Sequence, residues 1–65
     1  MESFKNRLKR IRWDKQLSQK QVAEMLGIPV STYANWEQGR TQPSVEDIRN
    51  IISLFDIDAN ELFKK

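Results

Sequence analysis

Val30, Ser31 and Asn35 are small or uncharged residues within a stretch whose apolar spacing is helical. A helix turns by about 100° per residue, so these three side chains lie toward one side of it. Tyr33 and Trp36, three residues apart, share the other side, and we expect both aromatic rings to face the interior. The three smaller side chains would then form part of the protein surface.

This predicted surface has an uncommon composition, because no charged residue occurs between Gly27 and Glu37. A helix face that is only solvated more usually carries Lys, Glu or Arg. A face of short, uncharged side chains can instead approach the base edges of duplex DNA. The Asn35 amide can pair with adenine N6 and N7, Ser31 can donate or accept, and Val30 can pack on a thymine methyl group. An isolated exposed Ser or Asn is usually just solvated, so this interpretation depends on the surrounding elements.

Those elements are all predicted to be helices, because no stretch alternates with the period of a strand. Helix caps, glycines and prolines mark the boundaries. The five expected helices run from about Ser3 to Lys15, from Ser18 to Gly27, from Ile28–Pro29 to Gln38–Gly39, from Pro43–Ser44 onward, and over a short segment that starts at Asp58–Ala59–Asn60–Glu61.

The second predicted helix begins with a capping box, in which Ser18 and Gln21 satisfy each other's backbone donors. It ends at Gly27, which is expected to adopt a left-handed backbone conformation. Gln19 lies in its first turn, where free N–H groups and the positive end of the helix dipole attract anions. Similar boxes are expected at Ser44–Asp47 and Asp58–Glu61. The expected buried residues are Phe4, Leu8 and Ile11, then Val22, Met25 and Leu26, and finally Val45, Ile48, Ile51, Ile52 and Phe55.

Composition limits the function classes that remain. A chain of 65 residues is predicted to form one domain, residues 1–65, with its function on the surface. The sequence has no Cys and no His, which removes the usual thiol and imidazole chemistry and the usual soft metal ligands. We therefore expect neither an enzyme nor a metal or other cofactor. No apolar run approaches the roughly 20 residues of a membrane span, and we expect a cytoplasmic protein.

Charge is distributed unevenly, although the net charge is only +2. Residues 1–20 carry seven Lys or Arg against two Asp or Glu, whereas residues 45–65 carry three against five. This asymmetry suits a small protein that is oriented on a polyanion. Charged helix surfaces are common, however, so the basic segment alone is weak support.

The segment Leu17–Ser44, LSQKQVAEMLGIPVSTYANWEQGRTQPS, combines these features in one order. It resembles the Cro and lambda-repressor-like helix-turn-helix family, and the resemblance extends from about Phe4 to Phe63. The matching positions are Leu8, Ile11, Arg12, Leu17, Ser18, Gln19, Ala23, Glu24, Leu26, Gly27, Ser31, Thr32, Trp36, Glu37, Gly39, Pro43 and Ser44. The resemblance implies an all-α, compact five-helix DNA-binding domain in which helices 2 and 3 form the helix-turn-helix and helix 3 reads the major groove.

The resemblance also implies roles for individual residues. Base contacts are expected from Val30, Ser31 and Asn35, and phosphate contacts from Gln19, Gln38, Arg40, Thr41 and Gln42. Arg12 and Glu37 match an arginine and a glutamate that pair inside family members, and we expect a partly buried bridge that positions helix 3.

Three residues depart from the family pattern. Gln16 replaces the usual Gly between helices 1 and 2 and is expected to hold a positive φ. Pro29 replaces a Ser or Thr that commonly caps helix 3, so the side-chain cap is lost. Trp13 occupies a position that is usually polar; we expect it to cover the edge of the core, and the alternative is exposure for a partner.

One reading helix covers only about four or five base pairs, so a homodimer on a two-fold operator is expected. Leu62 and Phe63 are adjacent large apolar residues and are the candidate dimer interface. Dimerisation only on DNA, or a longer protein with this chain as its N-terminal module, remain alternatives.

These patterns favour a sequence-specific double-stranded DNA binder that regulates transcription, as a repressor that blocks polymerase. The competing hypothesis is a protein-interaction module, such as an antitoxin or adaptor, with the same fold. An uncharged face beside Gln19 and Arg40 favours DNA. An exposed apolar patch that includes Trp13 and Phe63 would favour a protein partner.

Overall fold

The computed structural model describes residues 3–63, apart from the side chains of Ala59 and Phe63. Every regular element in this part of the chain is an α-helix, as the apolar spacing predicts. The helices are α1 (Phe4–Asp14), α2 (Gln19–Leu26), α3 (Val30–Gln38), α4 (Val45–Phe55) and α5 (Ala59–Phe63).

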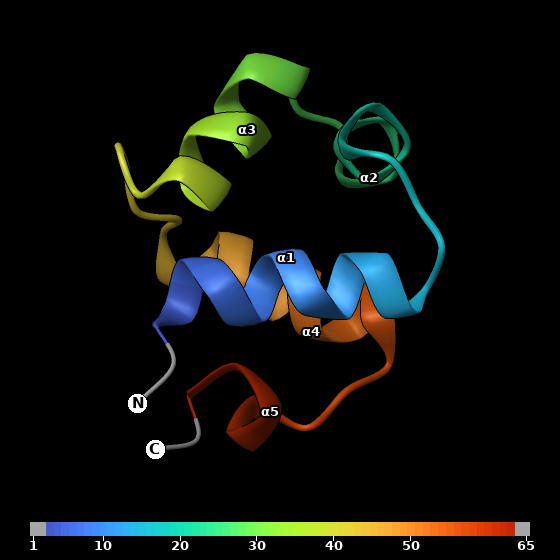
Figure 1. Ribbon diagram of the computed structural model, residues 1–65, viewed down its shortest axis with the longest axis vertical. Coiled ribbons are helices and arrows are strands. Elements are labelled where there is room, and N and C mark those ends of the chain that lie inside the picture. Colours follow the sequence, from blue (N-terminus) through green and yellow to red (C-terminus); the bar gives the residue numbers. More distant parts are fainter. Residues whose placement is uncertain (1–2, 64–65) are drawn as a thin grey trace.

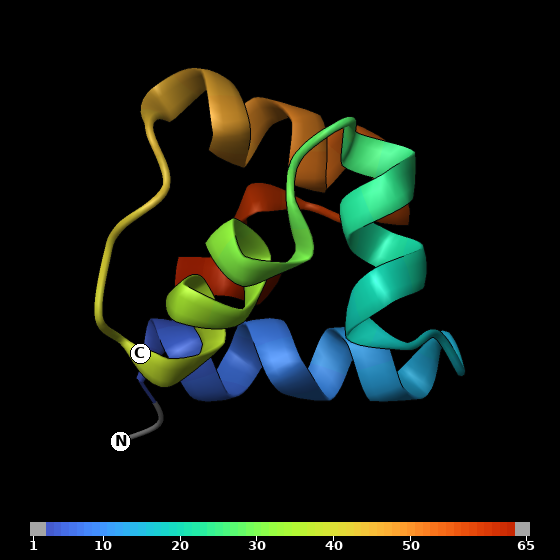
Figure 2. The same ribbon diagram turned by 90° about the horizontal axis from the view of Figure 1, so that it is seen from above.

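The helices enclose one apolar core (Figure 1). Seen from above, α1 and α4 lie along opposite edges and α2 closes one side between them (Figure 2). α3 packs on α1 and α2, and α5 packs on α1. The buried apolar residues come from all five helices and are Leu8, Ile11, Val22, Ala23, Tyr33, Trp36, Ile51, Phe55 and Leu62.

The predicted caps of α2 and α4 are confirmed. Ser18 Oγ accepts from the Gln21 N–H at 3.0 Å, while Gln21 Oε1 accepts from the Ser18 N–H at 2.8 Å. Ser44 and Asp47 form the same reciprocal pair, with both distances 3.0 Å. Such boxes satisfy N–H groups that the first turn of a helix leaves without partners, which fixes where each helix begins.

The start of α5 differs from the predicted capping box. The Asp58 side chain accepts from the N–H of Asn60 at 2.9 Å, and the Glu61 N–H donates to the Asp58 carbonyl oxygen at 2.9 Å. Asp58 therefore caps the helix through a tighter local turn, a geometry that short Asp side chains adopt readily.

Two residues expected in the core are exposed. Met25 is 57% exposed because Val22, Ala23 and Leu26 form the buried stripe of α2, and Met25 lies about 100° from its centre. Val45 is 70% exposed at the first residue of α4, where the helix extends beyond the core. Both predictions of burial were wrong.

Arg7 is buried, a feature that the sequence analysis did not predict. Its Nη1 donates to the carbonyl oxygen of Leu62 at 3.4 Å, so this arginine links α1 to α5. Its (CH₂)₃ stem can pack against apolar neighbours while its guanidinium satisfies a carbonyl of the short last helix.

A second arginine of α1 links that helix to α3. Arg12 Nε and Nη2 donate to Glu37 Oε2 and Oε1 at 2.6 and 3.0 Å, and Arg12 Nη1 donates to the Leu17 carbonyl oxygen at 2.8 Å. The guanidinium thus meets the carboxylate in a two-pronged arrangement, which is directional as well as attractive. The predicted bridge is present, and it is buried at both partners.

Gln16 has a φ of 59°, as its position in place of a glycine predicts. It shares this left-handed conformation with Gly27, Gly39 and Asp56. Asp56 ends α4 and was not foreseen, although Asp tolerates this conformation better than most residues. A glutamine gains no such tolerance, so the α1–α2 turn carries backbone strain.

The substitution Gln16→Gly should raise the free energy of unfolding by about 0.5 to 1 kcal/mol, because relief of the strain exceeds the added entropy of the unfolded chain. Urea or thermal unfolding measures this change. Lys15→Gly is the matched control, since Lys15 has an ordinary φ of −86° and should lose stability. If both variants lose stability, the account of strain at Gln16 is wrong.

Removing either partner of the Arg12–Glu37 bridge should cost about 3 to 5 kcal/mol of unfolding free energy, because the remaining charge stays buried without its counterpart. Arg12→Met and Glu37→Met together should cost clearly less than the two single losses added. A double-mutant cycle followed by urea unfolding measures both quantities. Additive losses below about 0.5 kcal/mol each would show two independent, solvated side chains.

Candidate nucleic-acid interface

The inner side of α3 is held by a cluster of polar groups centred on Glu37, which is only 2% exposed. Glu37 Oε1 accepts from Gln19 Nε2 at 3.0 Å in addition to its two bonds from Arg12. Burial alone would raise the pKa of the Glu37 carboxyl, but the hydrogen bonds from Arg12 and Gln19 and the positive charge of Arg12 lower it below its ordinary value. The carboxylate therefore stays ionised and joins α1, α2 and α3.

Tyr33 and Trp36 complete this inner side, as predicted. Both are buried, and their rings meet edge to face with centroids 6.0 Å apart. The Tyr33 hydroxyl is buried near Glu37 without a hydrogen-bond partner among the described residues. Burial raises the pKa of this hydroxyl, so the phenol remains neutral. A helix anchored by two aromatic rings and an ion pair has one defined rotation about its axis.

The outer side of α3 carries the residues expected to read bases. Val30 and Ser31 are exposed and Asn35 is half-buried, and Gln38 at the last turn is exposed. The predicted division of α3 into a buried and a surface side is thus confirmed. Within the described outer side no residue is charged, which leaves short side chains that can approach a ligand closely.

The start of α3 lacks a side-chain cap, as predicted from the presence of Pro29 at this position. Pro29 is the N-cap, with no side-chain hydrogen bond, and its carbonyl oxygen accepts from the N–H groups of Thr32 and Tyr33 at 3.1 and 3.3 Å. The helix begins at Val30, slightly later than expected. This places Val30 and Ser31 in the first turn, which is the part of a recognition helix that commonly approaches base edges.

The Gln19 side chain is partly used inside the protein, because one N–H of its amide donates to buried Glu37. The amide nitrogen carries a second N–H, so the expected phosphate contact of this side chain stays a prediction. The Gln21 N–H is satisfied by the Ser18 hydroxyl. The backbone N–H groups of Gln19 and Lys20 keep their anion-binding character, because the first turn of a helix has no intrahelical acceptors for them. Gln19 thus positions α3 through its side chain and can meet phosphate through its backbone.

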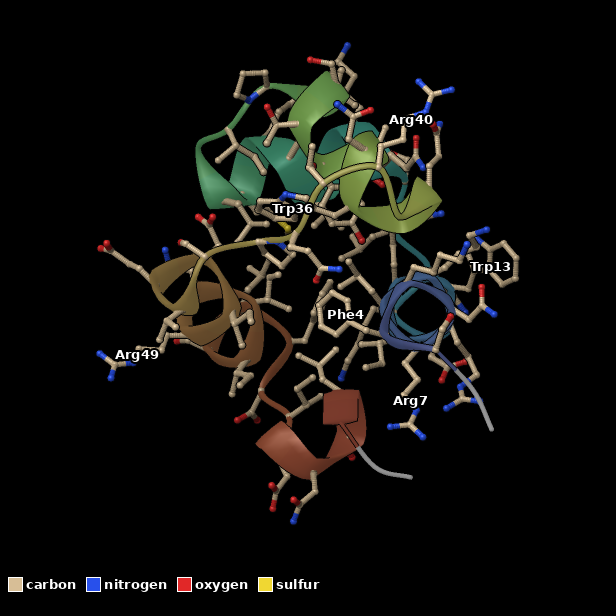
Figure 3. The ribbon with its side chains drawn as sticks, turned by 90° about the vertical axis from the view of Figure 1, so that its left-hand side faces the viewer. Phe4, Arg7, Trp13, Trp36, Arg40 and Arg49 are labelled. Carbon is tan, nitrogen blue, oxygen red and sulfur yellow. The ribbon has the colours of Figure 1, made fainter. Side chains whose placement is uncertain are left out.

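The loop after α3 holds the other residues expected at phosphates. Arg40, Thr41 and Gln42 are all exposed. Gly39 is the C-cap of α3, with a φ of 77°. The Arg40 N–H donates to the Asn35 carbonyl oxygen at 3.0 Å, which ends the helix. Figure 3 shows Arg40 extending away from the body of the protein at this end of α3. The structure therefore places an exposed positive charge beside the outer side of α3.

Trp13 was expected to cover the edge of the core. In the structure its side chain is 60% exposed, so this expectation was wrong. The buried stripe of α1 contains Leu8, Ile11 and Arg12, and Trp13 lies on the outer side (Figure 3). The Arg12 guanidinium carbon lies 6.0 Å from the Trp13 ring centroid, at the limit of a cation–π contact. The alternative, exposure of Trp13, is therefore the correct one.

The expected dimer interface is also corrected. Leu62 is fully buried in the apolar core cluster, because α5 packs on α1. Its side chain is not available to a second subunit. The side chain of Phe63 lies outside the described part of the structure.

The described residues include no group of three or more His, Cys, Asp or Glu side chains that could hold a metal ion. Over the same residues, none of the helices has the length and apolarity required to traverse a bilayer.

Comparisons with known proteins agree with this arrangement. A family model described as helix-turn-helix matches residues 8–62. The chain is 40% identical over 57 residues to the HTH-type transcriptional regulator AnsR of Bacillus subtilis, covering 88% of this chain and 49% of AnsR. It is 32% identical over 59 residues to the HTH-type transcriptional activator BcrR of Enterococcus faecalis, covering 91% of this chain and 29% of BcrR.

The fold is shared with a transcriptional regulator from Listeria innocua of known crystal structure. The TM-score is 0.83 and the sequence identity is 28%, over 92% of this chain and 56% of that one. The chain thus spans about half or less of the length of these similar proteins. The match over residues 8–62, the five-helix fold and the α2–α3 geometry lead to one conclusion: the chain belongs to the helix-turn-helix family of the Cro and lambda-repressor-like type.

Proposed function

We propose that the chain binds double-stranded DNA sequence-specifically, with α3 in the major groove, and thereby represses transcription. The observation that carries the proposal is the exposed, uncharged side of α3, opposite the buried Glu37 cluster. The major groove is about 12 Å wide and admits a helix whose side chains reach the base edges. Asn35 pairs with an adenine edge, Ser31 donates to or accepts from a base, and Val30 packs on a thymine methyl group.

Phosphate contacts on either side of α3 set its register on the duplex. The backbone at Gln19 supplies N–H donors at the start of α2, and Gln38, Arg40, Thr41 and Gln42 supply donors at the end of α3. Contacts of this kind fix orientation without reading sequence. The chain needs no cofactor, performs no catalysis and acts in the cytoplasm.

One reading helix contacts only a few base pairs, so the proposal includes a homodimer that binds a two-fold operator. Two half-sites about one helical turn apart double the sequence that is read. Repression then results when the bound dimer blocks access of polymerase to a promoter. BcrR is named an activator, so repression needs to be distinguished from activation by its own test. A reporter gene placed downstream of the preferred DNA site provides this test.

Trp13 supports a second candidate function, a protein-interaction module such as an antitoxin or adaptor. Its exposed indole is the kind of large apolar group that anchors protein partners. Trp13→Ala should abolish such a complex and leave DNA binding unchanged. Under the proposed function, the same variant keeps both its fold and its preferred DNA site.

Asn35→Ala should weaken binding to the preferred duplex by about 1 to 3 kcal/mol and relax the preference at one base pair in each half-site. Binding titrations with the preferred duplex and its single-base variants measure this. Arg40→Ala is the matched comparison. It should weaken binding to the preferred and the scrambled duplex alike, since a phosphate contact carries no sequence information. If Asn35→Ala keeps the preferred site intact, α3 is not the reading element.

The salt dependence of binding should be modest, because few Lys or Arg side chains lie on the proposed interface. Each neutralised phosphate adds about 0.9 to the slope of log K against log salt. The slope is measured on the preferred duplex at several salt concentrations. A flat line would contradict DNA binding, whereas a very steep one would place the basic α1 on the DNA backbone as well.

A further inference from the structure

A pocket of about 240 Å³ lies where the start of α1 meets the loop after α3. In both ribbon views these two segments lie toward the same side of the molecule (Figures 1 and 2). The lining consists of the aromatic residues Phe4 and Trp36, of Gly39, and of the polar residues Ser3, Lys5, Thr41 and Gln42. Trp36 is buried and Phe4 half-buried, so the polar residues are the ones that can meet a ligand.

Lys5 runs along the end of α3 at Gly39. A Cβ atom added at Gly39 would lie 3.0 Å from Lys5 Cδ and 3.5 Å from Lys5 Nζ. Glycine therefore serves two needs here, because its backbone has a φ of 77° and because the Lys5 stem occupies the space above it. This packing holds the Lys5 ammonium group at the start of the loop of residues 40–42.

The donors around the pocket match the oxygens of a phosphodiester. The Lys5 ammonium group offers three N–H donors and a full positive charge, and the Thr41 hydroxyl and Gln42 amide offer further donors. No Asp or Glu is among the described residues of the lining. A lysine with neutral donors beside it binds an anion, and lysine is a common phosphate ligand in proteins.

The position of the pocket suits the edge of the groove. From Ser31 to Gly39 the helix spans about 12 Å, which is close to the width of the major groove. When the first turn of α3 lies on base edges, its C-terminal end reaches a phosphate chain. Lys5 is also about 10 Å along α1 from Arg12, so the pocket is separate from the Gln19 end of the interface.

We propose that Lys5, together with Thr41 and Gln42, forms a binding site for a backbone phosphate of duplex DNA, so that α1 adds a contact from outside the helix-turn-helix. This inference rests on the proposed function. A purely structural role would be that the Lys5 charge stabilises the negative end of the α3 dipole. The two roles differ in what removal of the charge changes.

The test measures log K against log salt for Lys5→Gln on the preferred and a scrambled duplex, together with thermal unfolding. One lost phosphate contact should reduce the slope by about 0.9, so over a roughly fourfold rise in salt the variant should lose about 3.5-fold less affinity than the unaltered protein. The change should be equal on both duplexes. Lys5→Arg should keep the slope.

Arg49→Gln is the matched control, because it removes one positive charge from the exposed side of α4, away from Arg40 (Figure 3). Its slope should equal that of the unaltered protein. If Lys5→Gln behaves like Arg49→Gln, or lowers only the unfolding temperature, the phosphate site is overturned and the proposed function stands. If the unaltered protein binds no duplex in a salt-dependent way, the proposed function fails, and the Lys5 site with it.

Discussion

The buried carboxylate of Glu37 is the group on which the arrangement of α3 depends. Burying an unpaired charge costs several kcal/mol, so Glu37 is tolerated only where Arg12 of α1 and Gln19 of α2 donate to it together. Rotating or sliding α3 would break these directional bonds. Because Glu37 lies on the inner side of α3, its partners also determine that Val30 and Ser31 face outward.

Much of this organisation could be predicted from local signals. The capping pairs Ser18–Gln21 and Ser44–Asp47 mark helix starts because they satisfy specific N–H groups within three residues. The two sides of α3 likewise follow from short-range geometry, whereas the positive φ of Gln16 was predicted through the family resemblance. The Arg12–Glu37 bridge spans 25 positions, and it was predicted only through the family resemblance.

Features that depend on how helices pack together could not be predicted from spacing. Leu62 and Trp13 are both large and apolar, yet one is buried and the other exposed, because α5 packs on α1 while the outer side of α1 has no covering helix among the described residues. Arg7 belongs to the basic N-terminal segment and nevertheless lies buried against α5. The approach of Lys5 to Gly39 joins residues 34 positions apart, and no local pattern signals it.

The central claim is that α3, held in place by Glu37, reads DNA sequence. The most direct test of this claim is the selection of bound sites from a pool of random duplexes. The unaltered protein is mixed with the pool at moderate salt, and the bound fraction is recovered and sequenced over several rounds. The account predicts enrichment of one short motif, in two half-sites about one helical turn apart. Recovery of duplexes without any enriched motif, or of none at all, would contradict it.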